Sequence, residues 1–224
     1  VSSAASDVYK RQDYPNTYTV FAGGDDFFLI GPWRSTLNLA QEMRKAFTQY
    51  GAGNPDLHFS AGWSLTKPGL PIRQMGALAE AALEQAKDRQ DGQGKLLKDG
   101  ISCFGYTVGW QDLTKLWQIH QILESYQQEL ALSTKYLYEL QFLADMVDDI
   151  KSHPTNSRLD SALWPSRFAY RTYRLLEAKR SLTEEQRKDW SSRLTVLLGG
   201  GLNQYGSAFK IALFVHLYHH RHST

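Results

Sequence analysis

The segment that most constrains the fold of this chain is Gly-Gly-Asp-Asp at residues 23–26, close to the beginning of the sequence. It is flanked by two apolar, β-prone runs at residues 18–22 and 27–30. Two such runs around a short, glycine-containing turn predict a β-hairpin. This hairpin would carry two carboxylates at its tip.

The four turn residues indicate a chemistry as well as a shape. Gly23 and Gly24 can adopt backbone angles that are closed to other residues, and they let a phosphate approach the main chain closely. Asp25 and Asp26 add hard oxygen ligands, which Mg²⁺ on a nucleoside triphosphate requires. An acidic turn that only keeps a hairpin solvated fits the same four residues, so the neighbouring sequence has to decide.

The composition is that of a folded protein without a strong electric field. The 224 residues can form one large or two small domains, and the 42% that are hydrophobic suffice for a core. A net charge of +2 gives no reason to expect extended nucleic-acid binding by this chain alone. The single cysteine, Cys103, lies in an apolar run and is expected to be buried and inert. No run approaches the roughly 20 apolar residues of a membrane span, so we expect a soluble, cytoplasmic protein without a membrane partner.

Periodicity predicts a mixed α+β first part, in which Ser35 or Thr36 caps the first helix. The elements predicted after the hairpin are a helix that ends at Gly51, a strand at 57–65, a helix at 72–86 and a strand near 101–108. The order strand, strand, helix, strand, helix, strand is that of a ferredoxin-like palm, the scaffold of nucleotidyl cyclases and polymerases. The opening strand and helix of such a palm would precede Tyr14. We therefore predict a palm whose first strand is missing and whose metal site is incomplete.

The rest of the chain is predicted to be helical. From Trp110 onward apolar residues recur at helical spacing, and Gly199-Gly-Gly201 predicts a loop between the last two helices. The expected fold class is α+β, with a palm at residues 13–110 followed by an all-α domain at residues 111–224. Residues 1–12 are small and polar and look like a translated adapter, so we set them apart and expect the natural protein to begin upstream.

Several segments of the chain match those of a known protein family in order and spacing, which is much more specific than a Gly-Gly-Asp-Asp match alone. These segments are Phe21–Trp33, Leu57–Leu65, Lys67–Pro68, Pro71–Arg73, Ala79–Lys87 and Ile101–Trp110. In order and spacing they resemble the second palm domain of the large subunit of type III CRISPR effector complexes, in its Csm form. The resemblance covers most of residues 17–110, and the helical remainder resembles the C-terminal domain of that family more loosely.

The resemblance implies a nucleotidyltransferase that uses Mg²⁺ or Mn²⁺. Its substrate would be ATP, and its product would be a cyclic oligoadenylate made when target RNA binds. Asp25 and Asp26 would be the catalytic metal ligands, and Gly23 and Gly24 would leave room for the phosphates. The implied partners are the small and guide-binding subunits of the complex, the guide RNA and the target RNA. The chain by itself is expected to be inactive.

Two further residues acquire candidate roles in nucleotide binding from the same resemblance. Lys87, at the end of an amphipathic helix, would contact the triphosphate, although a solvated cation at a helix end fits equally well. Ser60, on the polar face of its predicted strand, would contact the nucleobase, although a solvent-facing serine needs no function.

Two alternative functions remain open at this stage. Gly-Gly-Asp-Asp-Phe27 differs by one acidic residue from the signature of diguanylate cyclases, but no Arg-x-x-Asp inhibitory site precedes it and over a hundred helical residues follow. The other alternative is a scaffold subunit of the RNA-guided complex that no longer turns over. DNA cleavage is not assigned to these residues, because the sequence contains no His-Asp dipeptide.

Two other polar clusters are interpreted without a function. Asp145, Asp148 and Asp149 lie at helical spacing and fit a solvated helix face. Four histidines crowd residues 216–222, and His216 and His220 share one helix face. Without a nearby acidic or thiol partner, they predict a frayed terminal helix rather than a zinc site.

Overall fold

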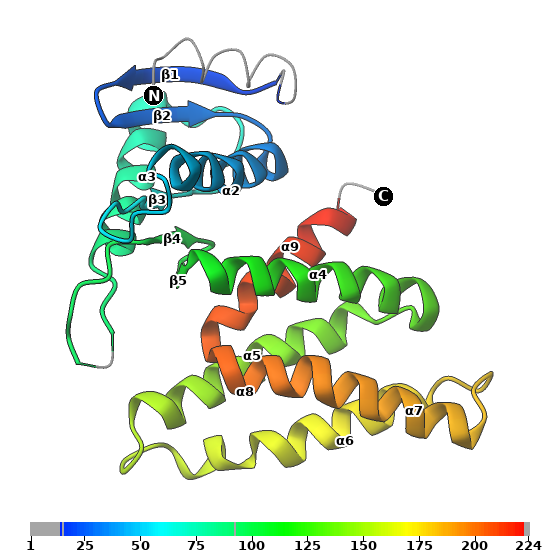
Figure 1. The fold of residues 1–224 in the computed structure, drawn as a ribbon. Coiled ribbons are helices and arrows are strands. Elements are labelled where there is room, and N and C mark those ends of the chain that lie inside the picture. Colours follow the sequence, from blue (N-terminus) through cyan, green and yellow to red (C-terminus); the bar gives the residue numbers. More distant parts are fainter. Residues whose placement is uncertain (1–13, 15, 92, 222–224) are drawn as a thin grey trace. The chain divides into compact units, whose positions relative to one another are not determined.

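The computed structural model describes residues 14, 16–91 and 93–221 and divides the chain into two compact units (Figure 1). The first unit ends at Trp110, and the second begins at Gln111. The first unit mixes strands and helices, whereas the second is helical. The predicted α+β class, a palm followed by a helical domain, is confirmed. The segment 1–12 lies outside the described residues.

The first unit contains a hairpin, two long helices and a small second sheet. Its elements are β1 (Tyr18–Gly23), β2 (Asp26–Ile30), α2 (Trp33–Tyr50), β3 (Ala61–Gly62), α3 (Ile72–Lys87), β4 (Gly100–Cys103) and β5 (Tyr106–Gly109). Strands β1 and β2 form one sheet, and β3, β4 and β5 form the other in that order. Strand β3 runs parallel to β4 and α3 connects them, as a parallel pair requires. Leu37, Ala86 and Ile101 lie fully buried in its core.

The hairpin predicted from the turn sequence is confirmed. Strands β1 and β2 pair antiparallel, and Gly23 lies opposite Asp26, so that Gly24 and Asp25 form a two-residue turn. Gly24 has a φ of 63°, whereas Asp25 is not among the residues with positive φ. This combination is typical of a type II′ turn, whose first central position favours glycine. The turn therefore depends on Gly24 for its backbone.

The strand predicted at residues 57–65 is wrong in its extent. Only Ala61–Gly62 forms a strand, and the end residues Leu57 and Leu65 are exposed. At this short strand the backbone lies against α3, since an added Cβ on Gly62 would overlap the backbone of Leu83. The alternation in the sequence therefore does not correspond to a long strand with two different faces.

Two other local predictions need correction. The proposed caps Ser35 and Thr36 lie inside α2, whose N-cap is Pro32, while the predicted end at Gly51 is confirmed. The single strand predicted near residues 101–108 is a hairpin. Phe104 and Gly105 both have positive φ, at 53° and 82°, so β4 turns back into β5 after four residues.

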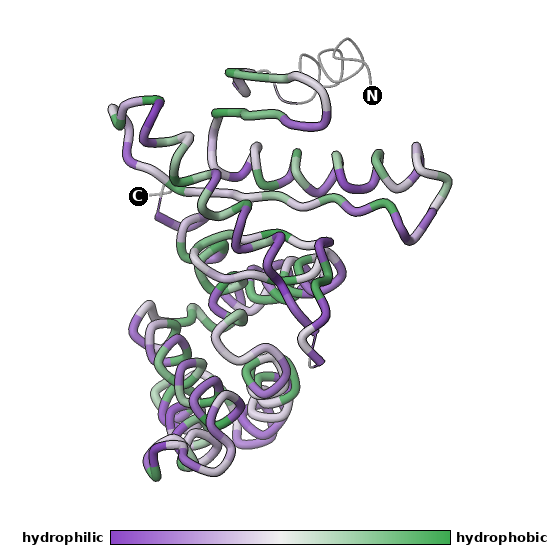
Figure 2. Tube along the Cα trace, turned by 90° about the vertical axis from the view of Figure 1, so that its left-hand side faces the viewer, coloured by the Kyte–Doolittle hydropathy of each residue, from purple (hydrophilic) through white to green (hydrophobic). Residues whose placement is uncertain are grey.

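The second unit is built from helices alone in its described part. Its elements are α4 (Trp110–Leu130), α5 (Thr134–Ser152), η1 (Leu159–Leu163), α6 (Trp164–Glu177), α7 (Glu184–Leu194), η2 (Thr195–Gly199), α8 (Gly200–Tyr205), η3 (Gly206–Phe209) and α9 (Lys210–Arg221). Hydrophobic and hydrophilic stretches alternate along these helices (Figure 2), as amphipathic helices around a shared core require. The buried stripe of α5 includes Leu137, Leu140, Leu143 and Val147. Within the described ranges, no helix has the length and apolar character needed to cross a membrane.

The loop predicted at Gly199–Gly201 is wrong, because the chain stays helical there. A π-helical segment, η2, ends at Gly199 and α8 follows directly. The glycines serve close packing, since an added Cβ on Gly201 would overlap the ring of Phe209 and one on Gly199 would lie 3.2 Å from Phe168. The helix ends instead after Tyr205, where Gly206 has a φ of 54°.

Gly201→Ala should therefore destabilise the chain, and Gly200→Ala is its matched control. Overpacking against Phe209 is expected to cost about 1–3 kcal/mol of unfolding free energy. Gly200 directly precedes Gly201 in the same helix and has nothing within 4 Å of an added Cβ. Alanine there should therefore raise the unfolding free energy by up to about 1 kcal/mol. Urea unfolding followed by circular dichroism measures both. Equal effects of the two changes would contradict the packing role of Gly201.

Candidate active site

The tip of the β1–β2 hairpin presents its four predicted site residues to solvent. Gly23, Gly24, Asp25 and Asp26 are all exposed. An added Cβ on Gly24 would meet nothing within 4 Å, so the space beside the turn is open. The turn thus offers two carboxylates and an unobstructed stretch of backbone, which fits a magnesium ion that arrives on a phosphate.

Aromatic packing supports the hairpin behind this tip. The ring of Phe27 in β2 stacks on Phe59 with centroids 6.1 Å apart, and Phe28 reaches Gly76 of α3. Phe59 also packs against Phe47 of α2 and against Trp110, each with a centroid distance of 5.6 Å. These contacts attach the hairpin to both helices of the first unit, beside which it lies in Figure 1.

The structure brings Lys87 into the electrostatic reach of the two aspartates. Its ammonium group forms an ion pair with Glu84 at 3.0 Å, and the side chain is 45% exposed. The hydrogen bond that Lys87 donates to Glu84, and then the negative charges of Glu84, Asp26 and Asp25, raise the pKa of Lys87, while burial opposes the rise. The charges of the acidic turn therefore act on Lys87, and a lysine ammonium suits the recognition of phosphate.

Ser60 lies next to the aromatic support of the hairpin. Its hydroxyl donates a hydrogen bond to the carbonyl oxygen of Lys98 at 2.9 Å. The residue before it, Phe59, stacks on Phe27 of β2. The hydroxyl oxygen of Ser60 can still accept a hydrogen bond from a nucleobase, since a serine oxygen has two lone pairs.

A second feature of the first unit escaped sequence reasoning. Arg44 of α2 and Asp99 form an ion pair at 2.9 Å across 55 residues, and no local pattern announces it. Asp99 also accepts a hydrogen bond from the backbone N–H of Phe59. A pocket of about 230 Å³ includes Arg44 and Asp99 in its lining, but none of the predicted site residues. The pair therefore serves to position the segment that carries Phe59.

Cys103 lies as expected, whereas only Asp145 among the three aspartates of α5 is exposed, so they do not form one solvated face. Cys103 is fully buried, and burial raises the pKa of its thiol to about 12, as expected for an inert thiol. The three aspartates of α5 turn to different neighbours. Asp145 pairs with Lys210, Asp149 accepts a hydrogen bond from Ser161, and Asp148 lies against Gly206.

The expectation that the C-terminal histidines lack an acidic partner is wrong. Glu124 of α4 lies 2.6 Å from His216 and 3.0 Å from His220. His120, one turn before Glu124, belongs to the same group. The signal in the sequence was the i, i+4 pair of His120 and Glu124, which precede His216 and His220 by 96 positions each. His222 lies outside the described residues.

An exposed acidic turn on a strand–helix scaffold defines the class of the first unit, a palm of the nucleotidyl cyclase and polymerase type. The comparison with protein families specifies it further, since residues 2–96 match the model of the Cas10/Cmr2 second palm domain. This match begins inside residues 1–12, the segment that was excluded from the predicted palm because of its composition. Residues 2–96 thus match this palm family, and the chain is similar to Cas10/Csm1 proteins of subtype III-A CRISPR systems.

Three curated relatives share the name "CRISPR system single-strand-specific deoxyribonuclease Cas10/Csm1 (subtype III-A)". The protein of Thermococcus onnurineus is 31% identical over 124 residues, which cover 51% of this chain and 15% of that protein. The protein of Enterococcus italicus is 30% identical over 168 residues, or 74% of this chain and 19% of the relative. That of Methanocaldococcus jannaschii is 30% identical over 107 residues, or 46% and 13%. The chain thus spans about a fifth or less of these relatives, and no solved structure gives a significant match.

The electrostatic link between Lys87 and the turn can be measured directly. In the double variant Asp25→Asn and Asp26→Asn, the pKa of Lys87 should fall, because two negative charges that favour the ammonium are removed. Glu84→Gln should lower it further, since the hydrogen bond that Lys87 donates to the Glu84 carboxylate is the largest cause of the rise. An NMR titration of the lysine side chain measures these values. An unchanged pKa in the double variant would mean that the turn and Lys87 do not act on one another.

Proposed function

We propose that this chain supplies the nucleotidyl-transfer palm of a type III CRISPR effector large subunit. The turn at residues 23–26 would bind Mg²⁺ or Mn²⁺ together with ATP, and the product would be a cyclic oligoadenylate. The observation that carries the proposal is the juxtaposition of two exposed carboxylates, an open glycine turn and the cation of Lys87. The palm-domain match of residues 2–96 and the similarity to Cas10/Csm1 proteins support the same assignment.

Each residue has a task that follows from its chemistry. Asp25 and Asp26 would hold the metal, which when bound neutralises phosphate charge and activates the attacking 3′-hydroxyl. Gly24 keeps side chains away from the backbone at the turn, so that phosphates can come close. Lys87 would attract and orient the triphosphate as a point charge. Ser60 would accept a hydrogen bond from the base.

The partners in this proposal are those of the whole effector complex. We propose that the subunit containing this chain assembles with small and guide-binding subunits, and that pairing of the guide RNA with a target RNA starts synthesis. DNA cleavage is named for the relatives, but we do not propose it for these residues, because a His-Asp nuclease motif is not among them.

Asp25→Asn with Asp26→Asn should abolish product formation in the assembled complex without unfolding the subunit. The loss is expected to exceed about 100-fold, since even outer-shell partners of a metal are worth 10–100-fold. The assay incubates the complex with labelled ATP or GTP, Mg²⁺ and target RNA, followed by separation of the products. Asp56→Asn changes another exposed aspartate of the first unit and should keep full activity.

The products of the unchanged complex distinguish the competing functions. Cyclic oligoadenylates support the proposal, and cyclic di-GMP would favour a diguanylate cyclase. No product with either nucleotide, from a complex that still binds its target RNA, would favour a scaffold. Full activity of the double variant would also overturn the proposal, because Asp25 and Asp26 would then not hold the catalytic metal.

A further inference from the structure

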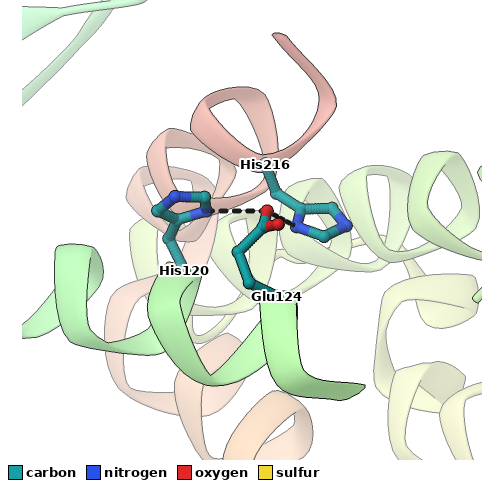
Figure 3. Close-up of side chains that lie close together, drawn as sticks. All are labelled: His120, Glu124 and His216. Atoms are coloured by element: carbon teal, nitrogen blue, oxygen red, sulfur yellow. Dashed lines mark ion pairs between the residues drawn. The ribbon is translucent and has the colours of Figure 1, made fainter. Parts of the chain in front are cut away.

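The helical unit contains a cluster of metal-ligand side chains that the nucleotide chemistry does not use. His120 and Glu124 lie one turn apart on α4, and His216 faces them from α9 (Figure 3). One ligand atom of each, two imidazole nitrogens and a carboxylate oxygen, lie within 4.8 Å of one another. Residues from two helices, separated by 92 positions or more, thus converge on one point.

The distances in this cluster are close to those of a tetrahedral zinc site. Oε1 of Glu124 lies 2.6 Å from Nδ1 of His216 and 3.6 Å from Nδ1 of His120. Ligand bonds of 2.0–2.1 Å at a tetrahedral angle place neighbouring ligand atoms about 3.3 Å apart. The two observed distances lie on either side of this value, so shifts of less than about 1 Å would bring both pairs to it.

Burial sets this cluster apart from ordinary surface charges. The side chains of His120 and His216 are 2% and 1% exposed, and that of Glu124 is 22% exposed. Two almost fully buried imidazoles that face one partly buried carboxylate form a polar group within the helical unit, and such groups are commonly paired or coordinate metals.

The more open side of the cluster offers further nitrogen ligands. Nε2 of His220 lies 3.0 Å from Oε2 of Glu124, and Nε2 of His219 lies 3.8 Å from the same oxygen. His220 follows His216 by one helical turn, with ring centroids 4.7 Å apart. Four histidines therefore surround one carboxylate, more than a single ion pair requires.

We propose that His120, Glu124 and His216 bind a Zn²⁺ ion, with His220 or a water molecule as the fourth ligand. Imidazole and carboxylate ligands in a four-coordinate arrangement suit zinc, whereas magnesium and calcium prefer oxygen ligands alone. The ion would connect α4 and α9, the first and last helices of the helical unit. Its role would be structural, because the site exists only when α4 and α9 meet, so that the free energy of binding stabilises the folded unit.

The test is zinc binding by the full chain and its variants. Metal-free protein is titrated with Zn²⁺ against a chromophoric chelator, and bound metal is counted by elemental analysis. One equivalent is expected, with a higher thermal unfolding midpoint in its presence. Glu124→Gln and His120→Ala should each weaken binding by at least about 100-fold. His153→Ala, which changes an exposed histidine of the same unit, should leave the affinity unchanged.

Two further measurements keep the proposal falsifiable. Circular dichroism of the metal-free variants verifies that they fold, and the visible absorption of bound Co²⁺ reports four-coordinate nitrogen and oxygen ligation in the unchanged chain. Failure of the unchanged chain to bind zinc overturns the proposal. So does full binding by folded His120→Ala together with loss of binding in a His219→Ala, His220→Ala double variant. That result would assign the metal to the terminal histidines alone.

Discussion

The position of the β1–β2 hairpin depends on aromatic side chains more than on backbone hydrogen bonds. Strands β1 and β2 pair with each other and not with β3, β4 or β5 in the described part of the chain. Phe59 is the centre of the aromatic contacts that support this hairpin, since its ring packs against Phe27, Phe47 and Trp110. The Trp110 indole also donates a hydrogen bond of 2.7 Å to the Phe59 carbonyl. Each aromatic pair contributes about 0.5–1.5 kcal/mol beyond its buried area.

This arrangement explains which parts of the fold could be predicted from sequence. The Gly23–Asp26 turn is a local problem, because one positive φ at Gly24 and two flanking β-prone runs determine it. Gly62 and Gly201 are different, since each lies where another element approaches too closely for a Cβ. A glycine that permits a turn and a glycine that permits contact look alike in a sequence. The strand at residues 57–65 and the loop at Gly199–Gly201 were therefore predicted wrongly.

The same distinction applies to the two candidate sites. The aspartates of the turn are adjacent in the chain, so their chemistry can be inferred from the order of the residues alone. The role of Lys87 is nonlocal, and the structure supplies only its electrostatic proximity to Asp25 and Asp26. The histidine cluster needs α4 and α9 to meet, and no periodicity within either helix announces that meeting. Sequence reasoning therefore treated His216 and His220 as a frayed end, when Glu124 provides their partner.

The two proposed sites differ in their ligand atoms, so the metals that they would bind differ in identity and in how long they stay bound. At the turn, Asp25 and Asp26 are exposed carboxylates, which suit a weakly held, hydrated ion that enters and leaves with each nucleotide. In the helical unit, buried imidazoles around Glu124 suit an ion that stays bound. Magnesium has little affinity for imidazole, and the turn offers no imidazole to hold zinc. Under the two proposals, one chain would therefore use a replaceable metal for catalysis and a resident metal for stability, without either ion occupying the other's site.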